Sequence, residues 1–281
     1  MVGPSGVGNN RPFANAPSYA VAIVISAIVI VPIAWVVLGG FRTTGQIADH
    51  PVALPHPWVG HNYAHVITSG TFWRELGNSV IVAVVATSLV VVVSSLAAYP
   101  LSRMRFRGRE AVYTFFTFGL LFPVTVAALP LYLLLKQLGL LETLWGVAFA
   151  EAAFAIPLTV IILRPFMRAI PTELEDATAM DGCSRFGFFW RVLLPLSRPA
   201  LVTVILLSLI FSWNNYILPL LVLTEPNHWT LPLGVAQYSS EHSSDTAGVL
   251  AFTTISMIPP LLFFLAAQRR IVGGLSGAVK G

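Results

Sequence analysis

The sequence predicts an all-α membrane protein with six transmembrane helices, and two observations carry that prediction. First, 56% of the 281 residues are hydrophobic and only 10% are charged, with a mean hydropathy of +0.78. A soluble domain carries about 25% charged residues, so this composition is typical of an integral membrane protein. Second, the apolar residues gather in six runs, each near the length of about 20 residues that a helix needs to cross a bilayer.

The six runs follow one another along the chain, separated by polar loops and turns. The predicted spans are 19–40, 78–102, 111–135, 144–163, 200–223 and 248–267. With their connections they form one transmembrane domain over 18–268. Residues 1–17 are predicted as a disordered tail, and 269–281 as a C-terminal tail. The first run exceeds the roughly 7–15 apolar residues of a signal peptide, which favours a retained helix. Pro123 and Pro130 predict kinks within the third span.

The distribution of positive charge predicts the orientation in the membrane. Six spans place both termini on one side, and the segments on that side hold 13 of the 16 Lys and Arg residues. Because positively charged segments remain in the cytoplasm, both termini are predicted to be cytoplasmic. The basic turn 103–109 and the polar segment 171–199 lie on the same side. The loops 41–77, 136–143 and 224–247 face outward.

The segment 171–199 is the longest polar stretch on the predicted cytoplasmic side, and it is predicted to fold as two short helices. Thr172 and Glu175 match a capping box at the start of the first helix. Gly182 stands where that helix should end. The second helix, 184–194, is predicted to end against Pro195. Its residues Phe186, Phe189, Trp190 and Leu193 recur at helical spacing and are predicted to pack it against the spans.

Polar residues within the spans are candidates for contact with a solute. Glu151 is predicted to lie about 10 Å below the outer end of its helix, where a carboxyl group is costly and usually functional. It could line a solute path, make a structural hydrogen bond to another helix, or couple to protons. Trp213, Asn214, Asn215 and Tyr216 offer aromatic and amide groups that suit a neutral polyhydroxylated solute. An interhelical polar clamp is the alternative for these four residues.

The sequence gives no sign of catalytic or metal chemistry. It lacks a glycine-rich phosphate loop, a G-x-S-x-G motif and an H-E-x-x-H motif, so an enzyme is not predicted and no cofactor is expected on this chain. The lone Cys183 excludes an internal disulfide. All six histidines fall in outward loops. His61 and His65 have the i, i+4 spacing of metal ligands, but no Cys or carboxylate pair supports them, and solvated loop histidines are predicted.

The segment 173–195 resembles the EAA loop of binding-protein-dependent ABC importer permeases. The resemblance is carried by Asp176, Ala177 and Thr178 at the E-A-A positions, by Gly182, and by Val192, Leu194 and Pro195 nine residues later. Two positions depart from the family pattern, since Asp replaces Glu and Thr replaces the second Ala. Glu175, one position earlier, could share the acidic role.

The resemblance extends over nearly the whole chain, to the maltose-transporter type of sugar permease and to the second of its two permease subunits. It is carried by Asn62-Tyr63, Phe72, Asn78-Ser79, the turn 103–109, Trp213-Asn214, the stretch 230–233 and the ending 277–281. It implies the fold of a type I ABC importer permease in a bacterial cytoplasmic membrane. The implied partners are a second homologous permease subunit, two ATP-binding cassette subunits that bind ATP and Mg, and an extracytoplasmic solute-binding protein. No nucleic acid is implied.

The resemblance also implies roles for individual residues. The helix 173–181 would be the coupling helix that contacts an ATPase subunit, and the outer loop 224–247 would touch the binding protein. ATPase coupling is expected at Glu175, Asp176, Ala177, Asp181 and Gly182, and a C-terminal ATPase contact at Lys280 and Gly281. The translocation path is expected at Glu151, Asn214, Asn215 and Tyr216.

Other functions stay open at the level of the sequence. An ion-gradient-driven secondary transporter is the main alternative, although a single carboxylate near the outer edge supports it poorly. A small membrane enzyme is disfavoured by the missing catalytic residues. Within the importer family, a glycerol-phosphate-like solute stays open because Arg42, Arg74 and Lys136 are predicted to face outward.

Overall fold

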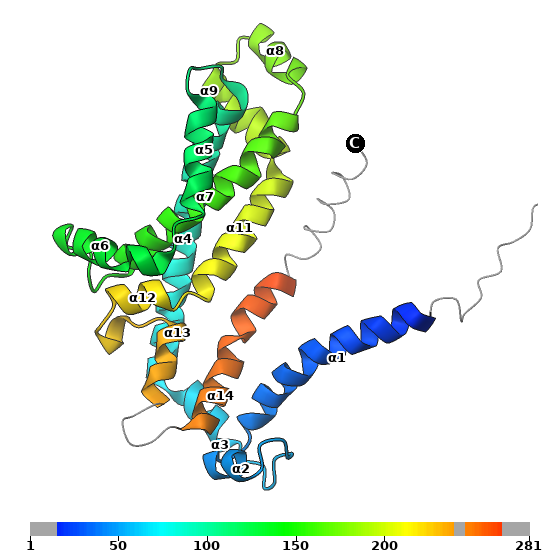
Figure 1. Cartoon of the computed structure of the whole chain (residues 1–281), viewed down its shortest axis with the longest axis vertical. Helices are drawn as coiled ribbons and strands as arrows, with labels where there is room; N and C mark the ends of the chain where they lie inside the picture. The colour runs from blue at the N-terminus through cyan, green and yellow to red at the C-terminus, as the bar shows by residue number, and fades with distance from the viewer. Residues whose placement is uncertain (1–15, 239–244, 266–281) are drawn as a thin grey trace, which may run out of the picture. The chain divides into compact units, whose positions relative to one another are not determined.

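The computed structural model describes residues 16–238 and 245–265, and these residues form helices and turns without any strand (Figure 1). The chain divides into two compact units. Unit 1 comprises residues 1–66 and 241–255, and unit 2 comprises residues 67–240 and 256–281. The predicted tails, which include Lys280 and Gly281, lie outside the described residues apart from Ala16 and Pro17.

Among the described residues, four helices are long and apolar enough to cross a membrane. They are Ser18–Gly39, Gly70–Arg103, Leu144–Ala169 and Thr246–Leu265. Two pairs of helices, each sharply bent at a short break, raise the number to six when each pair counts as one span. The all-α prediction with six spans is confirmed on that count, but two of the predicted spans are not straight helices.

Unit 1 contains a long apolar helix and the loop that follows it. Helix α1 (Ala16–Gly39) is apolar on every side and exposed over most of its length. Helix α2 (Thr44–Asp49) begins at a capping box formed by Thr43 and Gln46. Helix α3 (His61–Thr68) is tied to the end of α1, because Asn62 donates hydrogen bonds to the carbonyls of Gly40 and Arg42.

Arg42 is the centre of the loop in unit 1. Its side chain is 2% exposed, and its guanidinium donates hydrogen bonds to the backbone carbonyls of Gln46, His50 and Pro51. The planar fork of Arg suits several acceptors at once. Arg42 is therefore not available to bind a phosphorylated solute, because its terminal nitrogens donate within the loop.

Replacing Arg42 with alanine is expected to loosen the loop 41–60. A hydrogen bond to a charged group contributes about 1.5–3 kcal/mol, so losing this guanidinium should cost about 3 kcal/mol or more of local stability. Limited proteolysis of the purified chain measures the effect as faster cleavage in this loop. Arg74→Ala is the matched control, since Arg74 is exposed and makes no hydrogen bond or ion pair with the described residues. Equal cleavage rates in the two variants would contradict the role given to Arg42.

The core of unit 2 is built around α4 (Gly70–Arg103) and α7 (Leu144–Ala169), which make the most extensive helix contact among the described elements. Helix α11 (Arg198–Trp213) packs on both of them, and α5 (Arg109–Gly119) packs on α7. The buried small residues on α4 and α7 include Ala83, Ala86, Ala148 and Ala152. Small side chains allow close helix approach, which drives helix association in a membrane.

The third predicted span is broken. Helix α5 ends at Gly119, and α6 (Val124–Gln137) continues at an angle of 101° to it. Pro123 is the N-cap of α6, and the residue before a proline is disfavoured in helical backbone, so the chain turns at 120–122. The predicted kink at Pro123 is therefore a full break between two helices. Pro130 stays within α6.

The fifth predicted span is also broken, at its polar residues. Helix α11 ends at Trp213, and α12 (Ile217–Val222) begins after three intervening residues. The Asn214 amide donates to the carbonyl of Ile210 at 2.8 Å, and the Asn215 side-chain oxygen accepts from the Leu218 N–H at 3.2 Å. Asparagine amides compete with the backbone for its hydrogen bonds, so the two side chains end one helix and begin the next.

Candidate coupling segment and translocation residues

Helix α8 (Glu173–Met180) lies at the end of unit 2, beyond the ends of α4, α5 and α7 (Figure 1). The carbonyl of Thr172 accepts the N–H groups of Glu175 and Asp176 at 2.9 and 3.1 Å. Thr172 itself has helical backbone angles and makes no side-chain capping bond, so the predicted capping box does not form. Three acidic residues nevertheless occupy the first turn, where the helix dipole favours negative charge.

Gly182 ends α8 as predicted. Its φ is +77°, in the left-handed region that favours glycine. The Gly182 N–H donates to the carbonyl of Ala179 at 3.0 Å, and the Cys183 N–H donates to that of Thr178 at 2.9 Å. These two bonds are the Schellman pattern of a helix C-terminus, in which a residue with positive φ reverses the chain. Gly182 therefore sets the direction in which the chain leaves α8.

No residue of α8 is buried. Asp176, Ala177, Asp181 and Gly182 are exposed, and Glu175 is partly exposed. An isolated helix of this length is marginal in water, and packing normally supplies most of the stability of a helix in a protein. The five residues predicted for ATPase coupling are therefore accessible, fully or in part, within the described part of the chain.

The segment that carries α8 is held at both ends by the last turn of α4. At its entrance, the Arg103 guanidinium donates to the carbonyl of Ile170 at 2.6 Å. At its exit, the Tyr99 hydroxyl donates to the carbonyl of Arg185 at 2.9 Å. The Tyr99 ring also packs on Phe189, with 5.1 Å between the ring centroids. We call residues 170–185 the coupling segment. Its two ends are bonded to α4, and no residue of α8 between them is buried.

The second short helix continues past the predicted end. It runs through α9 (Arg185–Phe188), a π-helical turn η1 (Phe189–Leu193) and α10 (Leu194–Leu196), and then bends by 76° into α11. Pro195 has no N–H and its ring crowds the carbonyl one turn earlier. Widening the preceding turn to a π-helix relieves this crowding, so Pro195 is accommodated rather than ending the helix.

The side chains that attach this helix to the spans differ in part from those predicted. Phe189 and Leu193 are buried as expected, and they join a cluster with Phe188 at the ends of α4, α7 and α11. Phe186 and Trp190 are 64% and 49% exposed, so the prediction that they pack against the spans was wrong. The π-helical turn changes the angle between successive side chains, so regular helical spacing does not identify the buried face here.

Glu151 lies in α7 and is 1% exposed. Neither carboxyl oxygen has a hydrogen-bond partner of standard geometry among the described residues, although Ser212 of α11 is close enough to interact. The described helices enclose this carboxyl within the chain, so contact with a solute would require α4, α7 and α11 to separate. Glu75 is a second fully buried carboxyl, which the sequence analysis missed because α4 begins eight residues before the predicted span.

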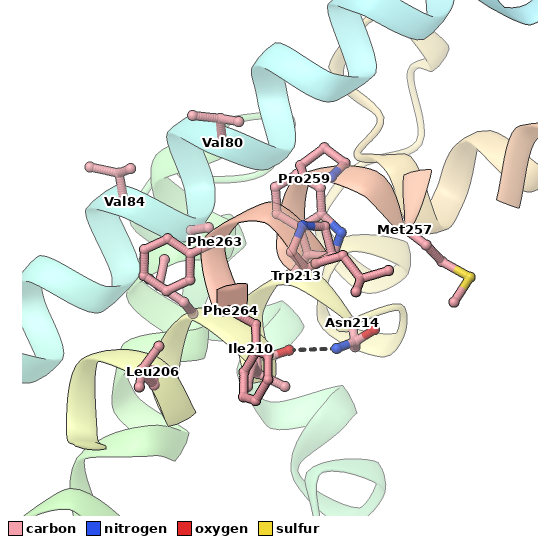
Figure 2. A pocket seen from close by; sticks show the side chains of 14 residues that line it. Val80, Val84, Leu206, Ile210, Trp213, Asn214, Met257, Pro259, Phe263 and Phe264 are labelled. Atoms are coloured by element: carbon pink, nitrogen blue, oxygen red, sulfur yellow. Dashed lines mark hydrogen bonds between the residues drawn. The ribbon is translucent and has the colours of Figure 1, made fainter. Parts of the chain in front are cut away.

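The break after α11 borders an apolar pocket of about 500 Å³ (Figure 2). Its walls come from α4, α11 and the residues 257–264, with Val84, Leu206, Phe263 and Phe264 among them. Trp213 and Asn214 both line it, and the Trp213 indole N–H donates to the carbonyl of Ser256 at 3.3 Å. Tyr216 is exposed outside the pocket, and Asn215 is partly buried. The four consecutive residues therefore do not form one polar surface.

The segment after α12 is pinned to α4 and to the turn after α6. The Asn78 amide donates to the carbonyls of Asn227 and Trp229, and the Ser79 hydroxyl accepts from the Leu231 N–H at 2.8 Å. Glu142 has a φ of +58° and accepts hydrogen bonds from the backbone and hydroxyl of Thr224 and from the Glu225 N–H. The segment 224–231 is thus held in one conformation.

No group of three or more His, Cys, Asp or Glu side chains within the described ranges is arranged to hold a metal ion. His61 and His65 lie on one face of α3 with 6.1 Å between their ring centroids, and no carboxylate or thiol joins them there. His242 lies outside the described residues.

A family model matches residues 90–276, about two thirds of the chain. The family is described as the inner membrane component of binding-protein-dependent transport systems. The chain belongs to this family. The match includes the end of α4, the coupling segment and both broken spans, so the features described above are those of a transport-system membrane component.

Curated relatives of this transport component cover nearly the same length. The diacetylchitobiose uptake system permease protein NgcG of Streptomyces coelicolor is 37% identical over 95% of this chain and 89% of its own. The lactose transport system permease protein LacG of Rhizobium radiobacter is 33% identical over 93% of this chain and 95% of its own. The arabinooligosaccharides transport system permease protein AraQ of Halalkalibacterium halodurans is 30% identical over 92% of this chain and 93% of its own.

Solved structures confirm the fold of the transport component. A chain of a bacterial ABC transporter for the acidic polysaccharide alginate matches with a TM-score of 0.78 and 23% identity, over 95% of this chain and 99% of its own. A chain of the alginate ABC transporter in complex with a pentasaccharide-bound periplasmic protein matches with a TM-score of 0.68 and 12% identity. The predicted fold of an ABC importer permease is therefore confirmed.

Glu142 makes the attachment of the segment 224–231 sensitive to acid. Burial raises the pKa of its carboxyl, but the hydrogen bonds from Thr224 and Glu225 and the nearby His228 outweigh burial and lower the pKa below its ordinary value of 4.5. Because the folded-state pKa is lowered, the stabilisation is present above pH 4.5 and is lost as the pH falls through that lower pKa. Hydrogen exchange at Thr224 and Glu225, corrected for the intrinsic rate, should accelerate in that range.

Two variants test this assignment. Glu142→Gln should accelerate exchange at Thr224 and Glu225 at neutral pH and remove most of its acid dependence. Glu225→Gln is the control, because its side chain makes no hydrogen bond or ion pair with the described residues. An acid response that is unchanged in Glu142→Gln would exclude Glu142 as its source.

Proposed function

We propose that this chain is a permease subunit of an ATP-driven, binding-protein-dependent importer for a neutral sugar or oligosaccharide. The observation that carries the proposal is the coupling segment, an exposed acidic helix that the last turn of α4 holds at both ends. The chain has no nucleotide-binding motif of its own, so a force applied by ATP hydrolysis has to arrive from partner subunits. Two such subunits, carrying ATP and Mg, are part of the proposal.

The proposed motion follows from the attachments of the coupling segment. An ATPase subunit that binds α8 and moves would displace the segment as one body. Because both ends are bonded to α4, the displacement would pass into α4 and then into α7 and α11, which pack on it. Alternating access by such rigid-body motion needs partners that bind the two states with different affinity.

Two observations support a sugar as the transported solute: the saccharides for which the relatives are named, and the exposed polar side chains of this chain. The relatives are named for diacetylchitobiose, lactose and arabinooligosaccharides, which are all saccharides. We place Asn214 and Tyr216 on the translocation path, because both are exposed. Asn215 and the enclosed Glu151 would reach the path only when helices separate. The path itself would form against a second, homologous permease subunit.

The proposed orientation places the coupling segment, both termini and the contacts of Lys280 and Gly281 on the cytoplasmic side, where the ATPases bind. The solute-binding protein would dock on the opposite side, against the loop that Asn78, Ser79 and Glu142 hold. A preformed loop suits such docking, since little ordering is required on binding.

An uptake experiment in proteoliposomes distinguishes an ATP-driven importer from a secondary transporter. Proteoliposomes would contain the chain with its second permease, its ATPase subunits and its binding protein, and would be tested with a panel of labelled neutral disaccharides and oligosaccharides. Uptake of at least one saccharide with ATP, and none with a non-hydrolysable analogue, is the expected result. Uptake driven by a proton or sodium gradient without ATP would overturn the proposal. Uptake of a phosphorylated solute alone would retain the importer but exclude the neutral sugar.

A further inference from the structure

The end of unit 2 that carries α8 also contains a basic cavity of about 940 Å³. It lies where α4 ends, where α5 begins and beside the last turn of α7. Five arginines line it: Arg103, Arg105, Arg107, Arg109 and Arg168. Of these five arginines, only Arg103 contributes to the attachment of the coupling segment.

The positive charge in this cavity exceeds what the chain neutralises. Glu110 is the single acidic residue in the lining, and its carboxylate already accepts from Arg109 and from Arg164. Arg164 is buried and fixed, since it also donates to the carbonyl of Leu101 at 3.0 Å and lies over the Tyr113 ring. The one carboxylate in the lining is therefore already shared by two arginines.

Three of the remaining guanidinium groups lack partners among the described residues. Arg105, Arg107 and Arg168 are exposed and make no hydrogen bond or ion pair with the described residues. The Nε of Arg103 is buried and has no acceptor, although its terminal nitrogen is bonded to Ile170. Unpaired guanidinium groups from two separate segments thus converge on one concave space. A group with several anionic oxygens, such as a phosphate, matches these donors.

The position of the cavity favours a lipid headgroup as the source of that anion. The helices that border it end there, so it lies at the level where membrane spans reach the lipid headgroups. Phe106, at the rim, is 44% exposed, and an exposed aromatic ring suits the boundary between headgroups and acyl chains. Basic pockets between spans on the cytoplasmic side bind anionic headgroups. The neighbouring helix α8 is acidic, so a protein surface complementary to α8 would be repelled by these arginines.

We propose that this cavity binds the phosphate headgroup of an anionic phospholipid. Arg105, Arg107 and Arg168 would hold the phosphate oxygens, and Phe106 would contact the glycerol and the upper acyl chain. Thr172, the residue before α8, also lines the cavity. A bound lipid would therefore lie against the start of the coupling segment, so the lipid composition of the membrane would influence how that segment is held.

The test uses the full-length chain in phosphatidylcholine nanodiscs doped with spin-labelled phosphatidylglycerol or spin-labelled phosphatidylcholine. The expected result is preferential immobilisation of phosphatidylglycerol by the unmodified chain. The double variant Arg105→Gln with Arg168→Gln should bind phosphatidylglycerol about 30-fold more weakly. Arg191→Gln with Arg198→Gln is the charge-matched control, because both arginines are exposed, lie outside the cavity and make no hydrogen bond or ion pair with the described residues.

Each other outcome contradicts the proposal. Equal loss in both double variants would mean that diffuse surface charge, rather than the cavity, attracts the lipid. An unchanged preference in the cavity variant would exclude the site. Displacement of the lipid by millimolar inorganic phosphate would identify a free-anion site. If the cavity variant keeps its lipid preference but no longer co-purifies with the ATPase subunits, the arginines form a protein-docking surface instead.

Discussion

Replacing Gly182 with valine is expected to reduce ATP-driven uptake about tenfold or more while the protein stays in the membrane at its normal level. Nothing lies within 4 Å of a Cβ at this position, so the effect is not a steric clash. The cause is the backbone, since a φ of +77° costs an L-residue roughly 1–2 kcal/mol and a β-branched residue more. A cost of 1.4 kcal/mol changes an equilibrium by about a factor of ten. Uptake and ATPase co-purification are measured together in proteoliposomes.

Two substitutions separate the role of Gly182 from a general loss of stability. Gly139 also has a positive φ, +66°, and also has open space at its Cβ, but it lies in the turn after α6. Gly139→Val should therefore keep normal coupling. Gly182→Asn should recover much of the uptake, because asparagine tolerates the left-handed region. Normal uptake in Gly182→Val, with normal ATPase co-purification, would contradict the role assigned to this residue.

Removing both bonds between α4 and the coupling segment is expected to uncouple hydrolysis from transport. In Tyr99→Phe with Arg103→Gln, the ATPase subunits should still bind α8 and hydrolyse ATP, since α8 is unchanged. The segment would then move without moving α4, and uptake per ATP hydrolysed should fall at least tenfold. The neutral hydrogen bond contributes about 1 kcal/mol and the charged one about 1.5–3 kcal/mol, and about 1.4 kcal/mol already corresponds to a factor of ten. Each single variant should show a smaller loss.

The control for the double variant makes the same chemical changes elsewhere. Tyr132→Phe with Arg198→Gln removes a hydroxyl and a guanidinium that have no partner among the described residues, and it should transport normally. If hydrolysis and uptake fall in parallel in Tyr99→Phe with Arg103→Gln, the two bonds support folding or docking rather than transmission. Unchanged uptake per ATP would show that another contact transmits the motion.

The features that depend on local sequence could be predicted. Apolar runs of membrane length identify the spans, because only a helix satisfies the backbone in a bilayer. Gly182 could be placed at the end of α8 because few other residues adopt a positive φ. The break at Asn214 and Asn215 was missed, and Pro123 was predicted as a kink rather than as a full break. Proline and asparagine often remain within membrane helices, and only the neighbouring structure decides whether the chain turns there.

The features that depend on distant contacts could not be predicted. Tyr99 and Arg103 donate hydrogen bonds to backbone carbonyls 86 and 67 residues away. Every residue has a backbone carbonyl, so the sequence does not indicate which one accepts the bond. The role of Glu142 depends on a backbone angle and on amides more than 80 residues later. The resemblance to sugar permeases includes Asn78 and Ser79 but gives no structural role for them. The structure supplies one, since both residues pin the segment 227–231.

Nucleotide-dependent cross-linking at α8 tests the central claim most directly. Cys183 is the only cysteine, so Cys183→Ser gives a background in which Asp176→Cys is the single thiol. In the assembled transporter, a short bifunctional reagent should link position 176 to an ATPase subunit, with a yield that changes when ATP is bound. Position 139, the turn after α6, should give no link as Gly139→Cys. Absence of any link at position 176 in a complex that still transports would contradict the account of α8 as the helix through which ATP hydrolysis drives this permease.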